Sequence, residues 1–192
     1  MGSNFSPNLA NLCLHFYETK FLDRNHDEGR NRYKYTYRYI DDLLSVNNRD
    51  IIHDVNAIYP RFLEISNTNV DNHNKGTFLD VDIKLSNNRF LTKVYDKRRE
   101  FEFDILGLPA FASNIPNNMS YGIICSQFCR FANICMKRED FLFNCQLVID
   151  KIKHNGFPTW LLKKYVRKFR YRKNRTITKF DLDHNLDDLL IF

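Results

Sequence analysis

Two adjacent carboxylates, Asp41 and Asp42, stand between two short segments that have the pattern of β-strands. Residues 34–39 alternate aromatic and polar side chains and residues 43–46 are mostly apolar, so the pair is expected in a tight turn between strands. Adjacent carboxylates repel each other unless a positive charge lies nearby. A divalent cation meets that need, and oxygen ligands suit Mg²⁺ or Mn²⁺. The simpler interpretation is a solvated acidic turn, which is common in proteins.

Phosphoryl transfer is the reaction that such a carboxylate pair would serve. Metal ions held by carboxylates activate the attacking hydroxyl and neutralise the leaving pyrophosphate. Apolar strands on both sides would hold the turn against a core, which is how the palm of a polymerase presents its metal site. Asp41 and Asp42 are therefore candidate catalytic residues and candidate metal ligands.

A basic segment near the C-terminus is the second candidate for chemistry. From Lys151 to Lys179 the chain has eleven Lys or Arg residues and no Asp or Glu, within an overall charge of +6. Such side chains bind phosphates independently of sequence, although a solvated charged face is the alternative. Aromatic residues among them would either stack on bases or pack in the core. The densest cations are Lys163, Lys164, Arg167, Lys168, Arg170, Arg172 and Lys173, with Trp160, Tyr165, Phe169 and Tyr171 interleaved.

The periodicity of apolar residues predicts the elements that position these groups. Helices are predicted at residues 6–21, 50–65, 120–135, 138–154 and 158–172, and strands at 34–39, 43–46, 77–85 and 90–95. Asn87 and Asn88 suit a tight hairpin turn, while Gly156 and Pro158 would end one helix and start the next. Ser6 is expected to cap the first helix. Its apolar stripe is predicted to be Leu9, Leu12, Cys13, Phe16 and Phe21.

The composition is that of an ordinary globular protein. The 192 residues, 43% of them hydrophobic, fit one domain or one compact lobe with an extension. The sequence shows no signal peptide and no apolar run near the roughly 18 residues of a membrane span. We therefore expect an intracellular location, in the nucleus, the cytoplasm or an organelle, and no membrane partner. The cysteines lack zinc-site spacing and are expected to be buried reduced thiols. They are Cys13, Cys125, Cys129, Cys135 and Cys145.

Several motifs resemble those of reverse transcriptases from Penelope-like retroelements. Tyr39-Ile40-Asp41-Asp42 is similar to the YxDD motif of reverse transcriptases. Residues 1–12 resemble the motif that precedes it in that family, and Glu18 falls where the family also has an acid. The later segments that resemble family strands and a thumb turn are residues 78–82, 92–97 and 155–158. The matches follow the family's order, which makes the resemblance stronger than any one motif.

The resemblance implies a right-hand polymerase that extends a DNA primer on an RNA template with Mg²⁺ (or Mn²⁺) as cofactor. It implies that Asp41 and Asp42 are the motif carboxylates, Asp41 being the direct metal ligand. It implies contacts with the incoming dNTP and the template from Gly2, Ser3, Phe5, Ser6, Pro7, Tyr39 and Lys75. It assigns the primer grip to Tyr95, Asp96 and Lys97. The basic segment would then lie in the thumb that holds the template–primer duplex.

The expected fold class is α+β, a partial right-hand palm with a short antiparallel sheet and packed helices, followed by an all-helical thumb. The expected divisions are a palm at 1–100, an irregular connection at 101–119, a helical thumb-like region at 120–175 and an acidic tail at 176–192.

Two functions stay open at this point. The first is an RNA-directed DNA polymerase of a retroelement that works by two-metal chemistry. The family's first catalytic aspartate lies on a strand for which this chain has no residues, so we expect the chain to be truncated and inactive alone. A separate chain would then supply the missing fingers and palm strand. The alternative is a non-catalytic reverse-transcriptase remnant that acts as a nucleic-acid-binding or structural subunit.

Overall fold

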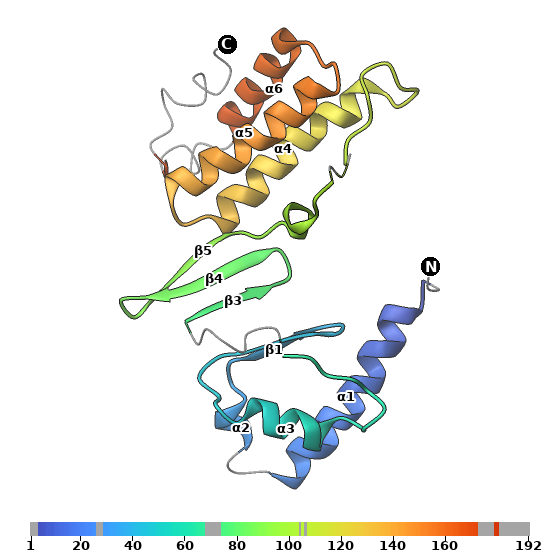
Figure 1. Ribbon diagram of the computed structural model, residues 1–192, viewed down its shortest axis with the longest axis vertical. Coiled ribbons are helices and arrows are strands. Elements are labelled where there is room, and N and C mark those ends of the chain that lie inside the picture. The colour runs from blue at the N-terminus through green and yellow to red at the C-terminus, as the bar shows by residue number, and fades with distance from the viewer. Residues whose placement is uncertain are drawn as a thin grey trace. The chain divides into compact units, whose positions relative to one another are not determined.

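The computed structural model describes residues 4–25, 29–67, 74–103, 105, 107–172 and 179–180. The fold is α+β with small antiparallel sheets, in agreement with the predicted class at that level (Figure 1). The chain divides into two compact units, an N-terminal unit of Met1–Leu79 and a C-terminal unit of Asp80–Phe192. Within the described ranges, no helix has the length and apolar character needed to cross a bilayer.

The N-terminal unit contains a hairpin and helices. Its elements are α1 (Ser6–Arg24), α2 (Gly29–Arg32), β1 (Thr36–Tyr39), β2 (Asp42–Ser45), α3 (Ile51–Ile58) and β3 (Lys75–Phe78). Strands β1 and β2 pair antiparallel, as predicted. Helix α3 ends at Ile58, not at residue 65 as predicted, because Pro60 disfavours helical geometry at Tyr59, which is extended.

The packed face of α1 differs from the predicted one. The side chains of Leu9, Leu12 and Phe16 are 66%, 67% and 61% exposed. The partly buried face consists of Ala10, Leu14, Tyr17, Glu18 and Phe21. Apolar residues occupy both sides of this helix, so helical spacing alone did not identify the face that packs. Ser6 lies inside the helix, whose N-cap is Phe5 without a side-chain capping bond.

A buried carboxylate joins α3 to the segment that follows α2. Asp54 is 6% exposed and receives an ion pair from the Arg32 guanidinium at 2.7 Å. The Tyr33 hydroxyl donates a hydrogen bond to the same carboxylate oxygen, Asp54 Oδ2, at 2.7 Å. Burial and this hydrogen bond raise the pKa of Tyr33 to about 12. The buried charge is thus both paired and hydrogen-bonded, the condition under which burial of a carboxylate is tolerated.

The C-terminal unit combines a hairpin with a bundle of helices (Figure 1). Its elements are β4 (Val81–Ser86), β5 (Arg89–Val94), η1 (Lys97–Glu100), α4 (Asn117–Ile134), α5 (Arg138–His154) and α6 (Thr159–Arg172). The β4–β5 turn is confirmed at Asn87 and Asn88, which have φ of 50° and 56°. The predicted strand 77–85 is interrupted by a turn at Leu79 and Asp80, and η1 was not predicted.

Aromatic residues from all three bundle helices form the core of the C-terminal unit. The Phe128 side chain is fully buried, with its ring 5.3 Å from Phe169 and 6.4 Å from Phe141, centroid to centroid. The Phe141 ring also stacks on Phe180 at 4.7 Å. These edge-to-face and stacked contacts fix the relative rotation of the helices, because aromatic pairs have preferred geometries.

The turn between α5 and α6 follows the prediction from sequence. Gly156 has φ of 82°, a conformation that costs glycine little, and its amide bonds to the carbonyl of Lys153. Phe157 then inserts into the core against Phe111 and Tyr121. The turn thus both ends α5 and anchors the start of α6.

The cysteine prediction is correct only for part of the set. Cys135 and Cys145 are fully buried, and burial raises the pKa of both thiols. Cys13 is exposed on α1, and Cys125 and Cys129 are partly buried. The exposure of Cys13 has the same cause as that of Leu9 and Leu12, since the helix packs through its other face.

Candidate functional site

The acidic pair lies in the two-residue turn between β1 and β2. Tyr39 is paired with Asp42, so Ile40 and Asp41 are the central residues of the turn. Ile40 has φ of 54°, whereas Asp41 is not among the residues of positive φ. This is the pattern of a type II′ turn, in which glycine is usual at the first central position. Asp41 and Asp42 are both exposed.

A guanidinium holds this turn against the rest of the N-terminal unit. Arg38 Nη1 donates a hydrogen bond to the Ile40 carbonyl at 3.0 Å and another to Asn11 Oδ1 at 2.7 Å. Arg38 Nε forms an ion pair with Glu18 Oε1 at 2.5 Å. The Tyr59 hydroxyl donates to the same Glu18 oxygen at 2.6 Å. Side chains from α1 and from the residue after α3 therefore hold the Arg38 guanidinium, which in turn bonds to the backbone beside Asp41.

Contacts within this network raise the pKa of the Arg38 guanidinium and of the Tyr59 hydroxyl, so both stay protonated and can donate hydrogen bonds. The hydrogen bond with Glu18 raises the pKa of Arg38, which remains a cation. Burial first, and then the hydrogen bond to Glu18, raise the pKa of Tyr59, which remains a donor. Sequence reasoning placed an acid at Glu18 but missed Arg38, Asn11 and Tyr59. The only signal for Arg38 was its polar position in the alternating strand that leads to the acidic pair.

We expect Ile40→Gly to leave the hairpin as stable as in the parent chain or more stable. A β-branched residue at positive φ costs on the order of 1–2 kcal/mol, which glycine would recover against the loss of some apolar contact. Hydrogen exchange of the β1 and β2 amides measures this stability. Leu44→Gly is the control, since Leu44 is also partly buried but lies in regular β2. That variant should lose about 1 kcal/mol or more. Equal losses in both variants would contradict strain at Ile40.

The residues predicted to contact nucleotide and template are spread along the N-terminal unit. Phe5, Ser6 and Pro7 are exposed at the start of α1, and Tyr39 is 58% exposed beside the turn. Lys75 is exposed at the first position of β3. Gly2 and Ser3 lie outside the described residues. Tyr39 is next to the carboxylates because it pairs with Asp42 across the hairpin.

The predicted primer-grip residues follow β5 in the C-terminal unit. The Tyr95 hydroxyl donates to Glu100 Oε1 at 2.6 Å, and Lys97 is exposed at the start of η1. Asp96 caps η1 by accepting from the Arg98 amide, and it also pairs with the Arg98 side chain. The side-chain hydrogen bond from Arg98 is the main reason that the pKa of Asp96 is lowered. Tyr95 and Asp96 thus make local structural contacts here.

Part of the basic segment forms an exposed stripe on α6. The cations of α6 whose side chains are described lie at helical spacing of three and four residues and are all exposed, namely Lys163, Lys164, Arg167 and Lys168. The opposite face is buried in the bundle core through Leu162, Val166 and Phe169. The stripe is therefore an accessible, one-sided cationic surface. Lys173 lies outside the described residues, as do the side chains of Arg170 and Arg172.

The aromatic residues of the basic segment divide between core and surface. Phe169 is buried, and Tyr165 stacks on Tyr121 with ring centroids 4.5 Å apart, so both are structural. Trp160 is 69% exposed and precedes Lys163 and Lys164 on the same face of α6. An exposed indole beside a row of cations suits a nucleic-acid strand, which offers both phosphates and bases. Tyr171 has no described side chain.

No group of three or more His, Cys, Asp or Glu side chains that could hold a metal ion occurs among the described residues. In that part of the chain, Asp41 and Asp42 therefore do not form a group with a third His, Cys, Asp or Glu side chain. The acidic-hairpin residues lie in the N-terminal unit, whereas the primer-grip and basic-stripe residues lie in the C-terminal unit.

Comparison with protein-family models matched residues 108–167 to the animal helix-turn-helix domain. The matched segment is about a third of the chain and includes α4, α5 and the first part of α6. In helix-turn-helix proteins, consecutive helices joined by short turns present one helix to nucleic acid. The match is therefore compatible, in general terms, with nucleic-acid binding by this unit. Searches among curated proteins and among solved structures returned no match.

Proposed function

We propose that this chain is part of an RNA-directed DNA polymerase, a reverse transcriptase of a retroelement, with Asp41 and Asp42 as its metal-binding carboxylates. The observation that carries the proposal is the strained acidic turn, in which Ile40 holds a positive φ beside two exposed carboxylates. Strained backbone of this kind persists where the surrounding structure imposes it and is concentrated at functional sites. Here the Arg38 guanidinium supports the turn by donating a hydrogen bond to the Ile40 carbonyl.

The chemistry of the pair fits Mg²⁺ or Mn²⁺, which prefer carboxylate oxygens. When bound, such ions supply activation of an attacking hydroxyl and charge neutralisation at a leaving pyrophosphate. Two carboxylates in an exposed turn leave most coordination positions to water, so the affinity for the metal should be weak. The role of Arg38, Glu18 and Tyr59 is to fix the turn backbone that aims Asp41.

The proposed partners are an RNA template paired with a DNA primer, and a dNTP. The basic stripe on α6 supports the duplex as a partner, because it is one-sided and exposed. Contacts of this kind hold the phosphate backbone and leave sequence unread. Tyr95, Asp96 and Lys97 would lie near the primer strand in this proposal.

A nucleic-acid-binding remnant without catalysis is the second candidate function. Two observations favour it, the lack of a third metal-binding side chain among the described residues and the helix-turn-helix match over residues 108–167. Under this alternative, Asp41 and Asp42 would be inherited surface residues, and the C-terminal unit would carry the activity.

The metal site can be tested with Mn²⁺, whose unpaired electrons broaden NMR signals of nearby nuclei. We expect millimolar Mn²⁺ to broaden amide signals around Asp41 and Asp42 first, and Asp41→Asn to abolish that effect. Asp23→Asn is the matched control, because Asp23 is an exposed carboxylate on α1, and it should leave the broadening unchanged.

In primer extension on an RNA template, the chain alone should incorporate no dNTP, because two-metal chemistry needs further carboxylates.

Two outcomes would count against these expectations. Broadening that is unaffected by Asp41→Asn would remove the hairpin as a metal site and with it the polymerase proposal. Incorporation by the pure chain that disappears in Asp41→Asn would support the polymerase but overturn the expected need for a separate chain.

A further inference from the structure

A cavity of about 230 Å³ lies in the C-terminal unit between η1, α4 and α5. Residues from the end of β5, from η1 and from one face of each helix line it. Its apolar wall includes Val94, Ile123 and Leu147. Its charged lining consists of four cations and one anion, namely Arg98, Arg99, Arg130 and Lys151 with Asp96. The cavity is thus strongly cationic.

Two of the four cations already have carboxylate partners. Arg98 forms two hydrogen bonds with Asp96, at 2.8 and 2.9 Å. Arg130 forms an ion pair with Asp80 at 2.6 Å. Arg99 and Lys151 pair with no carboxylate in the described part of the chain. The charge of Arg99 also acts on Asp96, but the four lining cations outnumber the two carboxylates near them, Asp96 and Asp80, by two.

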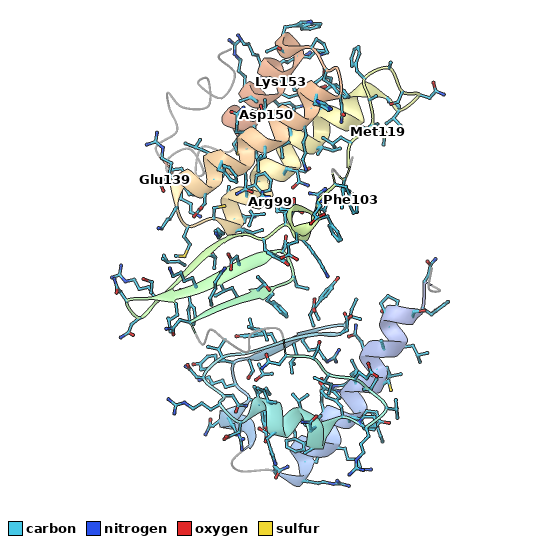
Figure 2. The ribbon with its side chains drawn as sticks, viewed as in Figure 1. Arg99, Phe103, Met119, Glu139, Asp150 and Lys153 are labelled. Atoms are coloured by element: carbon cyan, nitrogen blue, oxygen red, sulfur yellow. The ribbon has the colours of Figure 1, made fainter. Side chains whose placement is uncertain are left out.

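The Arg99 guanidinium is held in place by neutral groups. Arg99 Nη2 donates to Asn144 Oδ1 at 2.6 Å, and Asn144, which is 3% exposed, donates from Nδ2 to the Asp140 carbonyl. The guanidinium also lies 5.5 Å from the centre of the Phe143 ring. Arg99 belongs to η1, and Figure 2 shows it beside the end of the helical bundle. A neutral acceptor orients the cation without cancelling its charge, so the charge stays available to a ligand.

We propose that this cavity binds a phosphate monoester carried on a pentose-sized group. A phosphate monoester has a charge of about −1.5 to −2 at neutral pH, which matches the excess of two positive charges around the cavity. Arginine favours phosphate because its planar fork donates two parallel hydrogen bonds. The volume is below the roughly 300 Å³ of sites for drug-sized ligands, so a sugar phosphate fits better than a whole nucleotide. The apolar wall would take the carbon skeleton. This site is separate from the acidic hairpin and does not depend on polymerase activity.

Titration calorimetry of the full chain with ribose 5-phosphate, and with ribose as the phosphate-free probe, tests the proposal. We expect ribose 5-phosphate to bind and ribose to give no heat. Arg99→Gln and Lys151→Gln should each weaken binding about tenfold or more, because each removes a charge-assisted contact. Lys84→Gln is the matched control, since Lys84 is exposed in the same unit and does not line the cavity. Its binding should equal that of the parent.

Acidification supplies a second readout that follows the ligand. The affinity should fall as the pH drops below about 6, where the monoester becomes a monoanion. The lining cations stay charged there, and Arg98 keeps the pKa of Asp96 lowered, so Asp96 stays ionised. A 5′-phosphorylated dinucleotide, compared with its unphosphorylated form, distinguishes a strand end from a free sugar phosphate as the source of the phosphate.

Three results would overturn the proposal. They are absence of ribose 5-phosphate binding at millimolar concentration, equal binding of ribose, and parent-like binding in both cavity variants. None of them would bear on the acidic hairpin, whose test uses Mn²⁺ and Asp41.

Discussion

Replacing Lys163, Lys164, Arg167 and Lys168 with Gln should weaken binding to an RNA–DNA hybrid on the order of 100-fold and flatten its salt dependence. The four side chains form one exposed stripe on α6. Each phosphate contact contributes about 0.9 to the slope of log affinity against log salt on B-form duplex, so losing four contacts lowers it by up to about 3.6. Fluorescence anisotropy at several salt concentrations measures both quantities.

A charge-preserving variant is the matched control for this experiment. Lys163→Arg, Lys164→Arg, Arg167→Lys and Lys168→Arg together keep all four charges on the same helix face, so affinity and slope should stay near the parent's. Gln has nearly the helix propensity of Lys and Arg, so loss of binding in the Gln variant would not reflect loss of α6. If the Gln variant bound like the parent with an unchanged slope, the stripe would be an ordinary solvated face.

The single tryptophan gives an independent readout of the same interface. Trp160 is exposed and precedes the stripe on α6, so stacking on a base should quench its fluorescence when nucleic acid binds. If the fluorescence of the bound protein is still quenched at high salt, Trp160 stacks on a base. If the quenching only decreases in proportion to the bound fraction, it reports binding and gives no evidence of stacking.

Phe128→Ala should destabilise the C-terminal unit by about 3–5 kcal/mol. The Phe128 side chain is fully buried and touches aromatic rings from both other bundle helices, so its removal leaves a cavity that the helices can fill only in part. A domain of this kind is stable by about 5–15 kcal/mol, and the change would therefore consume much of that stability. Urea unfolding followed by the far-UV circular dichroism of the bundle helices measures the free energy.

The control for this core substitution is Phe90→Ala. Phe90 lies in β5 of the same unit, and its side chain is 50% exposed. Its truncation should cost at most about 1 kcal/mol, since much less apolar surface is removed from the interior. A loss below that value for Phe128→Ala would mean that the three helices do not share one packed core.

The sequence by itself determined those features that depend on a few neighbouring residues. Asn87 and Asn88 specified a hairpin turn because they tolerate positive φ, and both have it. Gly156 specified the end of α5 for the same reason. The alternating strand and the apolar run around Asp41 and Asp42 specified the acidic hairpin, with Asp42 the first residue of β2. In the Asn87–Asn88 turn and at Gly156 the conformational preference of single residues decides the structure, whereas the acidic hairpin follows from the pattern of its two strands and goes against the preference of Ile40.

Only the tertiary structure decided which surfaces pack and which partners the polar groups take. Helix α1 has apolar residues on both sides, so its own pattern did not show that Leu9 and Phe16 are exposed. The contacts of Arg38 with Glu18 join residues that are twenty apart in sequence, and the contact of Arg99 with Asn144 joins residues that are forty-five apart. Such pairs depend on how whole elements pack, a sum of many small energies that no local pattern encodes. The strained hairpin was therefore visible in the sequence as a motif, while the groups that hold it, and the cationic cavity, required the fold.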